Sequence, residues 1–152
     1  MIDPQQIKRN ILNDMRVELT EEFDRNFERK AFFSQKWKPR ADKFANGSLL
    51  IVTGTLRRSI RSNIDTNGVR FTSAVPYASI HNEGGTGSLT VRAHNRRTPS
   101  GRITQVRAHQ RKFYMPQRQF IGPGNNTTNI IKNVISDNLQ QFNLQLSKLL
   151  QQ

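Results

Sequence analysis

Apolar residues recur every four positions along the first part of the chain. This spacing predicts an amphipathic helix over residues 1–30. Because four exceeds the roughly 3.6 residues of a helical turn, the apolar stripe drifts around the helix and needs a covering surface, in this chain or in a neighbouring subunit. Asp3 is a candidate N-cap, and Pro4 suits the first helical position. Thr20, which two glutamates follow, is a candidate internal cap where the helix could bend.

A second helical pattern covers residues 125–150 at the C-terminal end. Its apolar positions follow spacings of three and four, and they are Ile131, Ile135, Leu139, Phe142, Leu146 and Leu149. Residues 125–127 offer Asn and Thr as N-caps. The polar face consists mostly of uncharged Gln and Asn, which suits contact with another subunit as well as contact with solvent.

A short β-hairpin is predicted over residues 62–73. Asn67-Gly68 suits a two-residue turn that needs a positive φ at both central positions. The candidates for its buried side are Ile64, Val69 and Phe71.

Two short helices are predicted on either side of this hairpin. The first covers residues 55–60, with Thr53 or Thr55 as its cap. The second covers residues 76–84, because a proline opens this stretch and a glycine ends it. Within it, Tyr77 is expected to contact the core.

The lone tryptophan, Trp37, lies in an irregular segment beside Phe32 and Phe33 and before Pro39. A tryptophan with aromatic neighbours in such a segment is most often a core residue beneath a loop. The alternative is a contact residue for a partner, since Trp is enriched at the energetic centres of protein interfaces. Trp37 is therefore a candidate for either role.

An internal repeat occupies the third quarter of the chain, where residues 90–97 are echoed by residues 105–112. Apolar and polar residues alternate in both arms, which predicts a long hairpin over residues 88–113 with turn residues 98–101 at its tip. Alternation within each arm predicts one weakly apolar face and one basic face. Because an isolated two-stranded ribbon is marginal in water, we expect this hairpin to be mobile alone and ordered by a neighbour.

The charge of the chain gives this hairpin a functional meaning. The 152 residues carry 24 Lys and Arg against 11 Asp and Glu, a formal net charge of +13, and residues 86–118 contain basic residues but no acidic one. Like charges this dense repel one another unless an anion lies nearby. We expect nucleic acid, an acidic protein surface or an acidic tube lumen to supply it; a solvated loop is the alternative. The predicted contact residues are Arg92, Arg96, Arg97, Arg107 and Arg111.

Other classes of protein are disfavoured. Hydrophobic residues make up 34% of the chain, which is lean but enough for one modest core. No apolar run approaches the roughly 20 residues that span a bilayer, and the N-terminus lacks a secretion signal. There is no cysteine, which excludes disulfides and thiol catalysis. These features favour a cytoplasmic origin.

No motif for chemistry stands out either. The three histidines, His81, His94 and His109, match no common metal-ligand spacing. Neither a nucleophile elbow nor a phosphate-binding glycine loop with a lysine is present. We therefore expect no enzyme activity, no catalytic residues, no metal and no cofactor.

Three blocks of the sequence carry short motifs that, taken together in this order, resemble those of a known family. They are residues 50–60 (L-x-x-T-G-x-L-x-x-S-I), residues 75–85 (Y-A-x-I-H-x-x-G) and residues 115–122 (M-P-x-R-x-F-x-G). Together they resemble the phage virion morphogenesis, or tail-completion, family. Residues 37–39 resemble the aromatic segment that precedes these blocks there. Order and approximate spacing agree over about residues 30–145.

The resemblance implies a small α+β structural protein of a tailed phage or prophage, with a single domain over residues 1–152. Its elements would be a long N-terminal helix, a small antiparallel sheet with an extended basic hairpin, and a C-terminal helix. It would act at the neck or head-proximal tail end, in tail completion and head–tail joining, as a ring of six copies. It would be found in the virion, and in the host cytoplasm during assembly.

The implied partners are the portal or connector, the tail-tube and tail-terminator proteins, and packaged DNA in the lumen, but no membrane. The alternative function is that of a basic nucleic-acid-binding module whose Arg-rich hairpin enters a groove.

Overall fold

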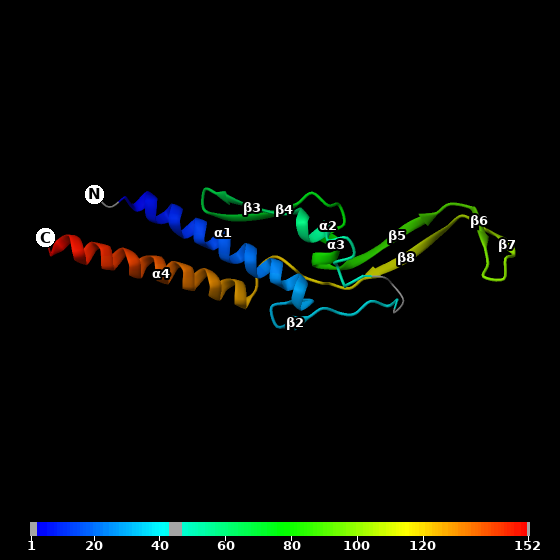
Figure 1. The fold of residues 1–152 in the computed structure, drawn as a ribbon. Coiled ribbons are helices and arrows are strands. Elements are labelled where there is room, and N and C mark those ends of the chain that lie inside the picture. The colour runs from blue at the N-terminus through cyan, green and yellow to red at the C-terminus, as the bar shows by residue number, and fades with distance from the viewer. Residues whose placement is uncertain (1–2, 43–46, 152) are drawn as a thin grey trace.

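Two long helices, short strands and an extended hairpin make up an α+β fold, which is the predicted class (Figure 1). The computed structural model describes residues 3–42 and 47–151. Helices α1 (Pro4–Arg29) and α4 (Asn125–Leu150) lie side by side, with the two chain ends at the same end of the molecule. The extended hairpin projects from the opposite end.

The shorter elements lie between α1 and α4 in the chain. They are β1 (Ala31–Phe32), β2 (Gln35–Lys36), α2 (Thr55–Ser59), β3 (Ile60–Asp65), β4 (Gly68–Ser73), α3 (Ala78–Glu83), β5 (Gly85–Val91), β6 (His94–Arg97), β7 (Ile103–Val106) and β8 (His109–Met115). Across residues 3–42 and 47–151 the strands form four antiparallel pairs: β1 with β2, β3 with β4, β5 with β8, and β6 with β7.

Helix α1 begins as predicted. Asp3 Oδ1 accepts a hydrogen bond from the N–H of Gln5 at 2.9 Å, and Pro4 is the first helical residue. The helix continues without a break past Thr20, whose hydroxyl donates to the carbonyl of Arg16 at 2.5 Å. The prediction of an internal cap is therefore wrong. Positions 1–2 of the predicted helix lie outside the described residues.

Helix α4 has the predicted bounds, but its buried face differs from the predicted stripe. Val134 is buried, whereas Leu139, Leu146 and Leu149 are 45%, 37% and 55% exposed. At about 100° per residue, Leu139 and Leu146 lie roughly 120–140° around the helix from the buried Val134, whereas Leu149 lies roughly 60° from it in the last turn of the helix. Its N-cap residue is Gly124 and has no side-chain cap, so the prediction of Asn or Thr caps is wrong.

The β3–β4 hairpin is present, with its turn one residue earlier than predicted. Asp65 pairs with Gly68, so Thr66 and Asn67 form the loop. The Asp65 carboxylate accepts a hydrogen bond from the N–H of Thr66 at 2.7 Å and so stabilises this turn locally. On the predicted buried side, Phe71 packs edge-on against Phe23 of α1, with ring centroids 4.9 Å apart.

Of the other two members of that side, Val69 is half-buried, whereas Ile64 is 44% exposed, so the predicted burial of Ile64 is wrong. The cap of the next short helix is also different. The N-cap of α2 is Gly54, with φ +72°, and neither Thr53 nor Thr55 caps the helix through its side chain. A β-carbon at Gly54 would lie 3.0 Å from the Arg58 guanidinium, which together with the positive φ favours glycine there.

The centre of the core is an extended segment, residues 116–124, which we call the clamped segment. Its Phe120 is fully buried against Phe27 of α1, with ring centroids 5.1 Å apart. Trp37 is 7% exposed and packs edge-on against Phe27, and its Nε1–H donates to the carbonyl of Gln119 at 2.6 Å. Trp37 thus occupies the core beneath a loop, and a side chain this buried presents little surface to a partner.

Two amides complete the clamp. Asn26 is fully buried, and its Nδ2 donates to the carbonyl of Phe120 at 3.1 Å while its Oδ1 accepts from the N–H of Phe33 at 2.8 Å. Asn82 Oδ1 accepts from the N–H groups of Phe120 and Ile121 at 2.9 and 3.1 Å. Since a backbone without a neighbouring strand needs such partners when buried, these side chains replace a sheet.

Replacing Asn26 with alanine is expected to lower the free energy of unfolding by about 3 kcal/mol, because it removes two hydrogen bonds and leaves two buried backbone groups unsatisfied. Urea unfolding measures this change. The matched control is Asn133→Ala on the exposed face of α4, with an expected change below about 0.5 kcal/mol. Equal losses in the two variants would contradict a role for Asn26 in holding the clamped segment.

Candidate functional site

The basic hairpin is longer than predicted and consists of two ladders. Strand β5 pairs with β8 and strand β6 with β7, in one shared register that runs from Gly85↔Met115 at the base to Arg97↔Ile103 near the tip. The ladders are separated at residues 92–93 and 107–108, where no pairing occurs. Gly101, with φ +83°, helps to close the predicted tip. The prediction of one long hairpin is therefore confirmed.

The prediction of one apolar and one basic face is wrong. Directly paired residues share a face of the ribbon, and the register pairs Val91 with His109 and His94 with Val106. In this register odd-numbered residues pair with odd-numbered ones, so they lie on one face of the ribbon and even-numbered residues lie on the other. Val91 and its repeat counterpart Val106 therefore lie on opposite faces. As a result, basic side chains stand on both faces.

The arginines of the hairpin differ from several arginines of the body in whether they form salt bridges. Arg92, Arg96, Arg97, Arg107 and Arg111 are all exposed, and within residues 3–42 and 47–151 none of them forms a salt bridge. The body arginines that pair with carboxylates are Arg9, Arg25, Arg29, Arg57 and Arg70. The five predicted contact residues are thus brought together as a cationic surface without a counter-charge of its own.

One of the body pairs joins α2 to α1. Arg57 Nε donates to Asp24 at 2.6 Å and its Nη2 to Glu28 at 2.7 Å. These hydrogen bonds, that to Asp24 first, raise the pKa of Arg57 above its ordinary value. Carboxylates of α1 are therefore engaged by arginines of the same chain.

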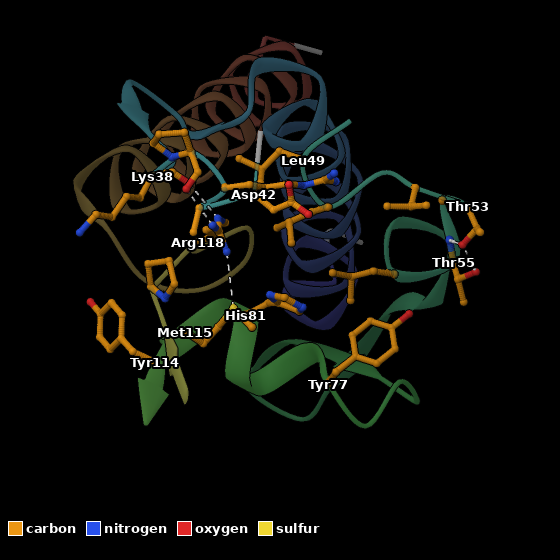
Figure 2. A pocket seen from close by; sticks show the side chains of 18 residues that line it. Lys38, Asp42, Leu49, Thr53, Thr55, Tyr77, His81, Tyr114, Met115 and Arg118 are labelled. Atoms are coloured by element: carbon orange, nitrogen blue, oxygen red, sulfur yellow. Dashed lines mark hydrogen bonds between the residues drawn. The ribbon is translucent and has the colours of Figure 1, made fainter. Parts of the chain in front are cut away.

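A second candidate site is a cavity of about 840 Å³ between the hairpin base and helices α2 and α3 (Figure 2). Its wall combines the three sequence blocks that resemble the phage family with the segment that follows Trp37. The aliphatic lining residues and Met115 make it mostly apolar, and they are Leu49, Leu50, Val52, Leu56, Met115 and Pro116. Sequence reasoning missed this cavity, because four separated stretches form it only after folding.

Arg118 forms the buried basic wall of the cavity and is only 5% exposed. Its Nε donates to the carbonyl of Lys38 at 2.9 Å, its Nη2 to the carbonyl of Pro39 at 3.2 Å, and its Nη1 to Met115 Sδ at 3.5 Å. Burial, followed by the positive charge of Arg40, lowers the pKa of Arg118. Its contacts are neutral acceptors.

His81 lies beside Arg118 in the same wall (Figure 2). Its Nδ1 is buried and has no hydrogen-bond partner among the residues that the structure describes. Burial, and after it the charge of Arg118, lowers the pKa of His81 below 6.5. Tyr77, which was expected to contact the core, is 46% exposed and lines the cavity; Ala78 is the buried residue of α3 instead. The ring of Tyr77 meets His81 edge-on at 5.8 Å.

The described part of the chain contains no group of three or more His, Cys, Asp or Glu side chains that could hold a metal ion. None of its helices combines the length and apolar character needed to cross a membrane. Its two candidate sites are a cationic hairpin and an apolar cavity with a buried guanidinium.

These features define a small basic α+β protein with two candidate surfaces for binding partners. A family model described as the phage virion morphogenesis family matches residues 3–140, which is most of the chain. The chain belongs to this family, and it is accordingly a phage virion assembly protein that interacts with other virion proteins. Comparison with curated proteins gave no match, and comparison with solved structures gave none either.

The buried state of His81 predicts a pH dependence of stability. With its folded pKa below the unfolded value of 6.5, the unfolded chain binds the proton more readily, so stability is lost as the pH falls below 6.5. In the His81→Gln variant this loss should be smaller, as measured by urea midpoints at pH 7.5 and pH 5.5. The control is His94→Gln, on the exposed hairpin. An unchanged pH dependence in His81→Gln would refute the assignment.

Proposed function

We propose that this protein is a structural subunit of the neck, at the head-proximal end of the phage tail. It acts in tail completion and head–tail joining as a ring of six copies. Its partners are the portal or connector and the tail-tube or tail-terminator proteins, and packaged DNA passes through the lumen. Membership of the virion morphogenesis family supports this proposal.

The observation that carries the proposal is the projecting cationic hairpin. It extends away from α1 and α4 at one end of the molecule (Figure 1), and its five arginines have no salt-bridge partner in the described structure. Such a surface repels other cations and attracts an extended anion. A ring of these subunits would present a strongly positive surface to a tail component or to DNA.

Charge also favours a particular surface for contact between copies. Two chains of net charge +13 repel each other at most orientations. Helix α4 carries little charge, because its only charged residues are Lys132, Asp137 and Lys148. Its exposed Leu139, Leu146 and Leu150 follow spacings of seven and four and form an apolar stripe that a neighbouring subunit can cover. Copies can therefore approach through α4 with little repulsion.

Reversing three hairpin charges tests the proposal. The variant Arg96→Glu/Arg97→Glu/Arg107→Glu is expected to fold, since these side chains are exposed and make no ion pair in the described structure, yet to reduce infectious particles at least about tenfold. The physical reason is that the reversed charges repel the anionic partner. Complementation of a phage that lacks the gene measures the yield, and circular dichroism checks the fold.

The matched control reverses three exposed charges of the body outside α4, in Lys8→Glu/Lys36→Glu/Arg61→Glu. It lowers the net charge by the same amount, so a loss confined to the hairpin variant assigns the effect to the hairpin. Normal infectivity of the hairpin variant, or an equal loss in both, would overturn the proposal.

A second candidate function is nucleic-acid binding through the hairpin. It is favoured by the basic residues on both faces of the ribbon, because a two-stranded ribbon inside a groove meets phosphates on two sides. In that case affinity for duplex DNA should fall by about 10³-fold or more between 50 and 200 mM salt. Fluorescence anisotropy measures this dependence. Absence of DNA binding by the wild-type protein at low salt would exclude this function.

A further inference from the structure

We propose that the cavity beside Arg118 is a docking site for an extended segment of another virion protein, in which an apolar side chain lies next to a carboxylate. The apolar side chain enters the cavity, and the carboxylate pairs with Arg118. This site lies at the base of the hairpin, and the proposal does not depend on the five hairpin arginines or on the ring.

The walls of the cavity favour an apolar side chain. Aliphatic side chains and Met115 dominate the lining, and Val52 at the rim is 65% exposed. Leu50 also lines the cavity and holds a φ of +60°, a conformation that costs energy in a leucine. Entry of an apolar side chain from a partner would be favourable, because it would remove both that side chain and these walls from water.

The carboxylate half follows from the state of Arg118. Its guanidinium is almost fully buried, but its three hydrogen bonds go to two carbonyl groups and a thioether. No salt bridge joins it to a carboxylate within residues 3–42 and 47–151. The cavity wall also carries the cations Lys38 and Arg40 and one carboxylate, Asp42, so the charges of the wall sum to a positive value. A buried charge is costly without an opposite charge, so a carboxylate from outside would be stabilised strongly here.

His81 supplies a second, independent observation at this wall. Its buried Nδ1 has no partner in the described structure, although buried polar atoms nearly always have one. A backbone N–H or C=O of a docked segment could satisfy this nitrogen, according to its tautomer. Tyr77 and Tyr114 lie on opposite sides of the cavity in Figure 2, where they can flank such a segment.

A second copy of this chain is a poor occupant. Asp24 and Glu28 of α1 are held by Arg57, and Asp65 is held by Arg70. Asp14 and Glu18, which also neighbour apolar residues, lie inside α1. An extended segment with a free carboxylate is therefore not offered by the described part of the chain. The occupant belongs to a different protein, and the net charge of +13 favours one that is acidic.

The test uses methionine methyl groups labelled with ¹³C in the intact protein. Met115 lines the cavity, whereas Met15 lies on α1 and serves as an internal control in the same spectrum. The probes are N-acetyl-phenylalanyl-aspartate amide, its asparagine counterpart of equal shape, and thymidine 5′-monophosphate. We expect the aspartate probe to shift the Met115 signal selectively and to bind about tenfold more tightly than the asparagine probe.

Two substitutions locate the site. Val52→Asp places a carboxylate at the exposed rim and is expected to weaken the aspartate probe at least about tenfold. Its control is Leu89→Asp, which adds the same charge to the hairpin at a residue that is 59% exposed, and which should leave binding unchanged. Arg118→Gln should abolish the preference for aspartate over asparagine. If Arg118→Gln fails to fold, the two probes still test the charge requirement in the unchanged protein.

Three results would overturn the proposal: equal binding of the aspartate and asparagine probes, equal shifts at Met15 and Met115, and tighter binding of the nucleotide. None of these results changes what is expected of the hairpin variants, so the docking proposal and the neck proposal can be refuted independently.

Discussion

The clamped segment is the constraint on which the rest of the structure depends. Strand β8 leads into it and α4 leaves from it, so its position sets the direction of both the hairpin and the C-terminal helix. Among the described residues no strand pairs with it, and side chains satisfy its backbone instead: Asn26 from α1, Trp37 from the loop and Asn82 from α3. Losing one of these side chains would leave a buried polar group of the backbone unpaired. This lowers the free energy of unfolding by more than the net contribution of one hydrogen bond.

The uneven distribution of charge follows the contacts that hold each part of the molecule together. In the body, Arg57 ties α2 to the carboxylates of α1, and Phe71 packs on the neighbouring turn of that helix. Acidic residues are used where they hold elements together. The hairpin needs no such cross-links, because its own ladder hydrogen bonds hold its two arms together, and its arginines remain available to a partner.

Local signals predicted the elements well where one or two residues decide the outcome. Asp3 and Pro4 start α1 because capping and a fixed φ act within one turn. The repeat with its turn residues predicted the long hairpin. The turn of β3–β4 was misplaced by one residue because the local hydrogen bond of Asp65 to Thr66 outweighs the preference for Asn-Gly. Leu139 was assigned to a buried face because periodicity does not reveal which part of an apolar stripe finds a partner.

The sequence alone determined the family, the α+β class, the two long helices and the cationic character of the hairpin, since these depend on motif order, period and composition. Only the tertiary structure decided which faces carry the charge, because pairing across the ribbon depends on register. It alone decided that Trp37 is a core residue and that Arg118 and His81 share one cavity. Residues far apart in the chain come into contact only when the core packs, so a local sequence pattern does not predict these contacts.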